Sequence, residues 1–521
     1  MDDDEEASIG KAHDAGKWRD DSQDAMSSKE EIVQEADVKM DLPKDEIEIE
    51  NVIVQPSLTD WDGPDDPENP RNWTYRKKMY HMSVATAIAF LCPFGSSVYT
   101  PGHEEVARMF GVSVEIALLP FTFYLLGLSF GPIIAGPSSE TFGRRAVYVS
   151  ALPAMAAFTL GAGFSQNITA LTLCRFFAGL FASPGLSIGT AMVSDFLAPE
   201  ERGGPVAVFI TMVQMGPVFG PIIGGYVTEG ESWRWTQWVI LFGLVFAFAL
   251  AWFMNESYKT VLLKRRAKQR GLNASITPSK STLWDAVRYF LTKTITRPIY
   301  MMCTEPIVAC FDIYNAFNFG ILNAFFAAFS WTFETVYGFG IGATGLTYLG
   351  QAVGSIAGLI IILVVYRTYW TRESRKAKAA GKANMAPEKR LIIAKIGAPM
   401  FPISMFWFGW TARPDIHWIS PVIAEGFFSC GNLLIFVCTG LYFTDCYGSL
   451  YSASAWSSCT FIRYLAAFGF PLFIVQVYEA LGVGWATSLL GFVGVALMPV
   501  PFVLHRYGER LRRRSKFSSG E

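Results

Sequence analysis

The sequence is poor in charged residues and in histidine. Asp, Glu, Lys and Arg together make up 17% of the 521 residues, and His occurs only 5 times, whereas hydrophobic residues reach 51%. A typical soluble domain carries about 25% charged residues, so this composition argues against an ordinary globular enzyme. It indicates a polytopic membrane protein instead.

Patterns that would indicate a cofactor are also missing. No Gly-rich loop ending in Gly-Lys-Ser/Thr occurs, so direct drive by ATP is not supported. The 8 cysteines are scattered singly without a C-x-x-C pair, which argues against a zinc site and a disulfide framework and favours a packing role. We therefore expect no metal, no cofactor and no nucleic-acid partner.

Long apolar runs dominate the chain. A helix needs about 20 predominantly apolar residues to cross a bilayer, and runs of that order recur twelve times. We expect an all-α membrane protein with twelve transmembrane helices. The runs lie near residues 79–100, 116–137, 146–164, 168–193, 204–227, 235–254, 300–328, 340–366, 391–411, 417–442, 449–475 and 482–504.

Basic residues are concentrated in alternate loops between these runs. Lys and Arg are frequent before the first run, between the sixth and seventh and in the C-terminal tail, but rare in the loops predicted on the other side. Because cytoplasmic loops carry an excess of Lys and Arg, both termini are expected in the cytoplasm. We expect a multi-pass protein of the plasma membrane, with the vacuolar membrane as the alternative.

Polar segments divide the chain into two halves. The first 50 residues are acidic and contain no apolar core, so we expect a disordered tail and no signal peptide. The longest internal polar stretch is basic and separates six runs from six, as a linker between two helical bundles would. The predicted parts are a disordered acidic tail at 1–78, a six-helix bundle at 79–254, a cytoplasmic linker at 255–299, a second six-helix bundle at 300–505 and a basic tail at 506–521.

The fifth apolar run contains the stretch GPVFGPIIGGY, which is unusually rich in glycine and proline for a helix. Gly216, Gly220 and Gly224 are spaced four residues apart and form a ridge without side chains, so a neighbouring helix can approach its backbone closely. Pro217 and Pro221 loosen the same turns. The ridge indicates either a hinge or sliding contact, or the close packing that is common in helical bundles.

The fuller pattern G-x-x-x-G-P-x-x-G-G resembles the span 5 motif of drug:proton antiporters in the major facilitator superfamily. That resemblance implies the fold of the superfamily, two six-helix bundles, and it implies export as the direction of transport. The motif residues are Gly216, Gly220, Pro221, Gly224 and Gly225.

The stretch GPSSETFGRR resembles the loop motif between spans 2 and 3 of the same superfamily. Gly136, Gly143, Arg144 and Arg145 are in register, and Glu140 stands where Asp is usual, as in fungal members of the twelve-span branch. A tight glycine turn flanked by acid and base can lock one bundle to the other and release it, which would switch the protein between two states. The alternative is a positively charged anchor on the cytoplasmic side.

Two charged elements in and after the fourth run resemble further motifs of the family. Arg175 lies inside the run, where an arginine costs roughly 2.5 to 3.5 kcal/mol on insertion scales, so it should face a cavity or a partner. The resemblance implies proton coupling, with Arg175 tuning a nearby carboxylate; structural pairing is the alternative. Asp195 and Arg202 resemble the Asp-to-Arg element of the conformational switch, or else anchor the helix end at the interface.

The second half supplies buried acidic residues. Glu305 and Asp312 lie seven residues apart on nearly the same helix face, about 10.5 Å along the axis. Asparagines extend this polar stripe, and Glu425 in the tenth run is a second candidate; polar stripes in an apolar span usually line a water-filled path. Candidate proton-coupling residues are Arg175, Asp312 and Glu425, and the candidate substrate cavity comprises Asp312, Asn315, Asn318, Asn323, Glu425 and Tyr442.

The resemblance to fungal drug:proton antiporters extends over most of the chain. It includes WDGPDDPENPRNW at 61–73, RPIYMMCTEPIV at 297–308 and the stretch at 442–473. Aromatic residues make up 15% of the chain and are frequent in runs 7 and 10, which favours a bulky amphipathic cargo.

We therefore expect a monomeric, proton-coupled exporter that works by alternating access in the lipid bilayer. Its ligands would be protons and a small amphipathic molecule, with a fungal secondary metabolite, mycotoxin or drug as the leading candidate. Two alternatives stay open. One is a polyamine exporter of the same family, and the other is a membrane receptor or scaffold that does not transport.

Overall fold

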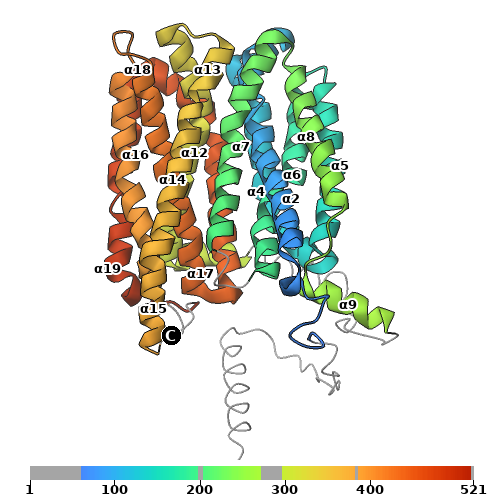
Figure 1. Ribbon diagram of the computed structural model, residues 1–521. Helices are drawn as coiled ribbons and strands as arrows, with labels where there is room; N and C mark the ends of the chain where they lie inside the picture. The colour runs from blue at the N-terminus through green and yellow to red at the C-terminus, as the bar shows by residue number, and fades with distance from the viewer. Residues whose placement is uncertain (1–59, 198–202, 271–295, 382–384, 518–521) are drawn as a thin grey trace, which may run out of the picture. The chain divides into compact units, whose positions relative to one another are not determined.

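A computed structural model of the chain describes residues 60–197, 203–270, 296–381 and 385–517. All of them belong to one unit, Pro56–Glu521. Within the described residues the chain is almost wholly helical and contains no strand, which confirms the all-α class (Figure 1). Residues 1–59 of the predicted acidic tail and 271–295 of the predicted linker lie outside the described residues.

Six long helices form the first bundle, and each coincides with one of the first six predicted runs. The closest packing joins α4 to α6, α2 to α7, and α5 to both α6 and α8. The elements are η2 (Pro70–Asn72), α2 (Tyr75–Ser97), η3 (Thr100–Gly102), α3 (His103–Phe110), α4 (Val114–Phe142), α5 (Arg144–Gly163), α6 (Ile168–Phe196), α7 (Gly203–Gly230), α8 (Arg234–Trp252) and α9 (Lys259–Gln269).

The second half forms the other bundle, in which α17 packs against α12, α14 and α16. Its elements are α11 (Arg297–Thr304), α12 (Pro306–Tyr337), α13 (Ile341–Thr347), α14 (Leu349–Val365), η5 (Tyr366–Trp370), α15 (Thr371–Ala379), η6 (Pro387–Leu391), α16 (Ile392–Thr411), α17 (Ile419–Gly469), α18 (Pro471–Leu497) and α19 (Val500–Arg512).

Local sequence explains several helix ends. The Asn167 side chain accepts a hydrogen bond from the Ala170 backbone N–H at 2.8 Å, so it caps the first turn of α6. Gly111 and Gly338 end α3 and α12 in the left-handed conformation, with φ of 64° and 65°, which favours glycine.

The helix α17 contains two of the predicted runs and turns back on itself at Gly448, where φ is 60° and ψ is −167°. The ring centroids of Phe436 and Trp456 lie 5.2 Å apart, whereas twenty residues of straight helix would separate them by about 30 Å. The loop expected between residues 442 and 449 is therefore replaced by a glycine turn, and α17 has two arms. A similar break occurs in α18 at Gly482.

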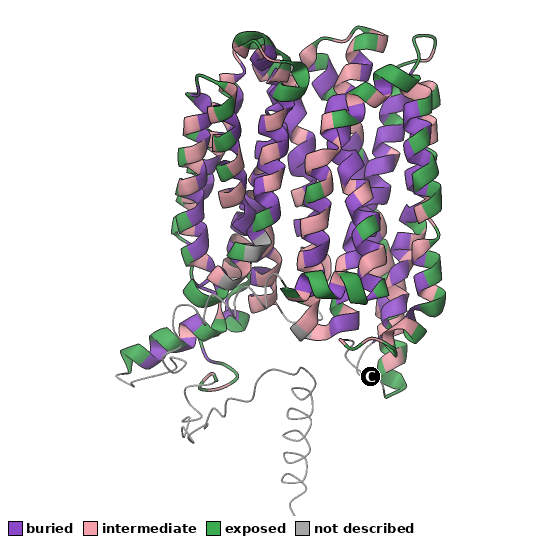
Figure 2. Cartoon of the chain, turned by 180° about the vertical axis from the view of Figure 1, so that it is seen from behind, coloured by how far each residue is buried: buried purple, intermediate pink, exposed green. Residues whose placement is uncertain are grey.

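Eleven described helices are long and apolar enough to cross a membrane. One of the twelve predicted spans is not among these eleven. It is the second arm of α17, which carries several serines and Arg463. Figure 2 shows buried residues along the inward faces and exposed residues along the outward faces. Large apolar side chains such as Phe246 in α8 and Val353 in α14 are exposed, as lipid contact requires.

The two bundles meet along α7, which packs against α13 and α14, and along α4, which packs against α17. We call the end that carries α9 and α15 the basic end; α3 and α13 lie at the opposite end (Figure 1). Part of the segment predicted as a disordered tail up to residue 78 is folded, because residues 60–74, the N-terminal strap, lead into α2.

Candidate functional site

Arg175 lies fully inside the first bundle, on α6. Its Nη1 donates to the Gly95 carbonyl at 2.7 Å and its Nη2 to the Ser96 carbonyl at 2.9 Å, while the guanidinium lies over the Tyr124 ring at 4.6 Å. These carbonyls belong to the last turn of α2, where no further helical N–H is available to them.

Arg175 therefore caps the C-terminus of α2, where a cation is also favoured by the helix dipole. No carboxylate contacts Arg175 within the part of the chain that the structure describes. The carboxylate partner expected from the sequence is thus absent there. The described contacts are those of a helix cap, and a role of Arg175 in proton coupling stays a prediction.

The loop motif forms a tight turn between α4 and α5. Gly143 has φ of 100°, and an added Cβ would collide with the Glu256 carboxylate. Glu256 accepts hydrogen bonds from the Arg144 N–H at 2.8 Å and the Arg145 N–H at 3.2 Å, so it caps the N-terminus of α5. Arg144 Nε also donates to Asp195 Oδ2 at 3.3 Å.

The described partners of Arg144 and Arg145 belong to the first bundle or to the segment after α8. Asp195 receives a second hydrogen bond from Ser257 Oγ at 3.0 Å, and Arg144 lies over the Tyr258 ring. Glu140 is exposed and has no ion pair among the described residues, and Arg202 lies outside them. The contacts join α4, α5, α6 and the start of the linker; a lock between the bundles stays a prediction. Gly136 is half-buried in α4, with open space beside its α-carbon.

The predicted glycine ridge of α7 lies against α2. A Cβ added to Gly216 would be 2.5 Å from the Phe90 carbonyl oxygen, and one added to Gly220 would be 2.7 Å from the Val98 nitrogen. Gly224 approaches Val98 in the same way. The expected close approach of a neighbouring backbone is present.

The opposite face of the same motif touches the second bundle. A Cβ on Gly225 would lie 2.9 Å from the Ile341 carbonyl oxygen, and one on Gly345 would lie 2.5 Å from that of Pro221. α7 is thus in backbone contact with α2 on one side and with α13 on the other. Any movement of one bundle against the other must slide or open this contact.

The polar stripe of α12 is buried in the second bundle. Asp312 is 1% exposed; its Oδ2 accepts a hydrogen bond from Ser458 on the second arm of α17, and its Oδ1 has no partner among the described residues. Asn315 donates to the Thr439 hydroxyl at 2.9 Å. Asn318 is buried with both side-chain atoms unpaired, whereas Asn323 donates to the Phe319 carbonyl at 2.8 Å.

Glu425 belongs to a separate polar pair between α14 and α17. Its Oε1 accepts a hydrogen bond from Gln351 Nε2 at 2.7 Å, and both side chains are buried. One turn further along both helices, the Ser355 and Ser429 hydroxyls lie 2.7 Å apart. The two predicted acids therefore occupy different polar clusters.

Tyr442 lies apart from both clusters. Its ring contacts Phe311, and its hydroxyl is close to Gly508 in α19. Glu305, at the start of α12, accepts a hydrogen bond from the Tyr447 hydroxyl at 3.3 Å. The structure thus assembles Asp312, Asn315 and Asn318 on one face of α12 but directs Tyr442 toward the basic end.

Sequence reasoning gave no role to three buried polar residues, of which Arg463 lies in the stretch at 442–473 that carries the family resemblance. Glu256 was assigned to the linker, and Gln351 belongs to no motif that was recognised. Arg463 is 8% exposed, lies over Phe319 and Phe436 at 4.4 and 4.3 Å, and its Nε has no partner among the described residues. The signal that could have found all three is the cost of a polar side chain within or beside an apolar span.

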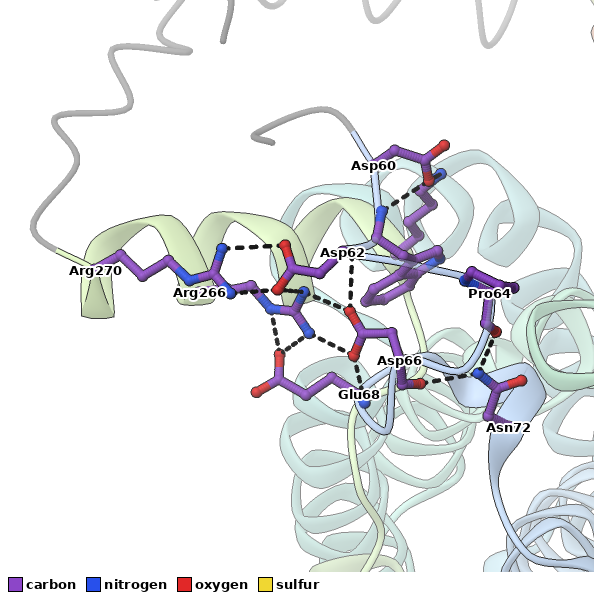
Figure 3. Close-up of polar contacts among 10 residues, drawn as sticks. Asp60, Asp62, Pro64, Asp66, Glu68, Asn72, Arg266 and Arg270 are labelled. Carbon is purple, nitrogen blue, oxygen red and sulfur yellow. Dashed lines mark hydrogen bonds and ion pairs between the residues drawn. The ribbon is translucent and has the colours of Figure 1, made fainter. Parts of the chain in front are cut away.

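The N-terminal strap is bound to α9 by ion pairs (Figure 3). Arg266 donates to both Asp66 oxygens, at 2.6 and 2.8 Å, and to Glu68 at 2.7 Å. Asn72 closes the strap on itself by donating to the Pro64 carbonyl at 2.7 Å. The hydrogen bonds from Arg266 hold the pKa of Asp66 well below its ordinary value and raise the pKa of Arg266.

The described residues define the class of the protein as an α-helical membrane protein. It has two bundles in contact along α7, buried polar clusters in an apolar interior and an apolar outer surface. The sequence profile of the Major Facilitator Superfamily matches residues 85–459. The chain belongs to this superfamily, whose members are transporters and not enzymes.

Curated relatives agree with this assignment. The chain is 36% identical over 490 residues to "Polyamine transporter 4" of Saccharomyces cerevisiae, covering 89% of this chain and 74% of that protein. It is 34% identical to "Citrinin biosynthesis cluster MFS transporter mrr1" of Monascus ruber, covering 90% and 96%, and 32% identical to "Efflux pump radE" of Floropilus chiversii, covering 96% and 91%.

Solved structures confirm the fold. The proton:xylose symporter XylE bound to 6-bromo-6-deoxy-D-glucose superimposes with a TM-score of 0.59 at 15% identity, covering 84% of this chain and 96% of that one. A partially occluded inward-open form of XylE from E. coli gives a TM-score of 0.59 at 14% identity, covering 82% and 99%.

Proposed function

We propose that the protein is a proton-coupled exporter of a small amphipathic organic compound, with a fungal secondary metabolite, mycotoxin or drug as the leading candidate. It works as a monomer by alternating access, with the basic end and both termini in the cytoplasm. The plasma membrane is the proposed location, and the vacuolar membrane is the alternative.

The observation that carries this proposal is the set of buried polar atoms that lack partners inside an apolar bundle. Asp312 Oδ1, both amide atoms of Asn318 and Glu425 Oε2 are unpaired among the described residues. An unpaired buried polar group costs about 1–3 kcal/mol, so such atoms persist where water, a proton or a cargo can reach them in another state.

Proton entry supplies the energy for export. The electrical part alone is worth roughly 2.3 kcal/mol per charge for each 100 mV of membrane potential. Asp312 and Glu425 are the acids that can carry the proton. The span 5 pattern at α7 and the relative named an efflux pump support export as the direction.

The test is the accumulation of a panel of labelled compounds in drug-sensitive yeast that express the full chain. We expect lower accumulation of at least one compound, abolished by a protonophore and by Asp312→Asn, which removes the acid of the candidate substrate cavity on α12. Asp415→Asn, in an exposed loop between α16 and α17, is the matched control and should export normally. Equal accumulation with and without the protein at the cell surface, for every compound, would contradict the proposal.

A polyamine exporter is the second candidate, and the 36% identity to "Polyamine transporter 4" favours it. Buried acids such as Asp312 would then bind the cationic amine directly. If the protein exports polyamines, spermine should compete with export of the labelled compounds. If it does not, spermine should leave their export unchanged. Membership of a transporter family disfavours a receptor or scaffold that does not transport.

A further inference from the structure

The pair formed by Glu425 and Gln351 leaves two acceptor atoms without a donor. Gln351 Nε2 donates to Glu425 Oε1 at 2.7 Å, while Gln351 Oε1 and Glu425 Oε2 are both buried without a partner among the described residues. An ionised carboxylate only accepts hydrogen bonds, and an amide oxygen also only accepts. Neither atom can satisfy the other as long as Glu425 is ionised.

Within the part of the chain that the structure describes, no other donor and no counter-charge contacts Glu425. Among the described residues, no Lys, Arg or His side chain forms an ion pair or a hydrogen bond with Glu425. The Tyr348 hydroxyl donates to the Phe325 carbonyl at 3.1 Å, and the neighbouring Ser355 hydroxyl is bonded to Ser429. On α12, Glu334 lies near Tyr348, and Asp312 is bonded to Ser458 in the other polar cluster.

The helix backbones leave little space for water beside this pair. A Cβ added to Gly426, next to Glu425, would lie 2.6 Å from the Gly350 carbonyl oxygen, next to Gln351. The rings of Phe325 and Phe428 pack beside this pair, with their centroids 5.3 Å apart. Glu425 and Gln351 are 1% and 0% exposed, so an unpaired negative charge here would be strongly unfavourable.

We propose that Glu425 is the proton-binding residue of the transport cycle and that Gln351 positions it by forming an acid–amide pair. A proton from water adds to Glu425 Oε2 without breaking any covalent bond, and the new O–H donates to Gln351 Oε1. One proton thereby satisfies both unpaired acceptors and removes the buried charge. The inference rests on the proposed proton-coupled export and assigns the proton to Glu425 in preference to Asp312.

Proton loss has a structural consequence in this arrangement. The ionised pair places a charge and two unpaired acceptors between α14 and α17, which destabilises their close packing. Because α14 also packs against α7 of the first bundle, this change acts on the contact that must open when the bundles move. Protonation of Glu425 therefore favours the state described here, and deprotonation favours the other state.

The first test is infrared spectroscopy of the purified full chain in lipid vesicles, because it reports protonation without requiring transport. We expect the carbonyl band of a buried, protonated carboxylic acid near neutral pH. The band should vanish in Glu425→Gln and persist in Asp312→Asn. It should move to higher frequency in Gln351→Met, which removes the hydrogen-bond partner, and stay in place in Ser355→Ala, the matched control one turn away.

The second test separates this inference from the proposed function. For a compound that the wild type exports, Glu425→Gln should lose proton-driven export but keep exchange of labelled for unlabelled compound across the membrane. Retained exchange also shows that the variant is folded. A missing band in the wild type, a band that survives in Glu425→Gln, or proton-driven export by Glu425→Gln would overturn the assignment. Absence of transport by the wild type would contradict only the proposed function.

Discussion

Arg266 in α9 and Asp66 in the N-terminal strap form a bidentate ion pair, with N–O distances of 2.6 and 2.8 Å. Both side chains are buried, at 8% and 3% exposure. Arginine matches a carboxylate in this two-point geometry, which is stronger than a single exposed contact. The pair therefore holds the strap in one position on α9.

Replacing Asp66 with Asn should weaken the docking of the strap by about 1–2 kcal/mol, because Arg266 would keep its charge and lose its best partner. Faster tryptic cleavage at the exposed Arg71 would report the loosened strap. The exposed Asp60 pairs with Lys259 at the surface, so Asp60→Asn is the control and should leave the cleavage rate unchanged. If trypsin cleaves Asp66→Asn and Asp60→Asn at the same rate, the ion pair does not hold the strap.

The same pair predicts how the strap responds to acid. Since the pKa of Asp66 is lower in the folded chain than its unfolded value of about 3.9, the pair stabilises docking at every pH above that value. The stabilisation is lost as the pH falls through the lowered folded pKa. The rate of amide hydrogen exchange in the strap, corrected for the intrinsic pH dependence of exchange, should stay low from pH 7 to about pH 4. The rate should rise only below about pH 4.

An alanine at Gly220 should destabilise the first bundle by about 1–3 kcal/mol, because its Cβ would collide with Ser97, the last residue of α2, and with Val98, which follows it. Gly204 in the same helix has open space, so Gly204→Ala is the matched control. Thermal unfolding of the two purified variants measures the difference. Equal midpoints would mean that α7 and α2 are less closely packed than described.

Replacing Arg175 with Gln should lower the stability of the folded chain by about 2–3 kcal/mol, since two charge-assisted hydrogen bonds to the end of α2 are lost. Arg108 is exposed in α3, and Arg108→Gln should leave the unfolding midpoint unchanged. If Arg175→Gln abolishes export but leaves the midpoint unchanged, Arg175 acts in coupling and its cap of α2 contributes little.

Hydropathy located the helices because its signal is local, and the apolar runs largely coincide with the observed helices. The cap of α6 by Asn167 was not predicted. The two apolar runs predicted a reversal between residues 442 and 449. Its form, a turn at Gly448, was not predicted, because a single glycine does not distinguish a tight turn from a packing contact.

The candidate site was predicted in part. Asp312 and Glu425 are buried, as expected of acids within apolar spans, but their partners come from distant helices that no local pattern specifies. Arg175 was expected to meet a carboxylate. Its shortest described hydrogen bonds go instead to backbone carbonyls, which every residue carries and no sequence pattern singles out. Glu256 was assigned to a linker because its role depends on the turn at Gly143.

The strap also decides where the chain can be shortened. A protein that starts at residue 60 keeps every contact described for the strap, including Asp66 with Arg266. One that starts at residue 79, at the first apolar run, loses the strap and the first turn of α2, and leaves Arg266 without its carboxylates. The acidic residues before the first membrane helix thus belong to the folded protein from Asp60 onward, and a shortened protein for purification should retain them.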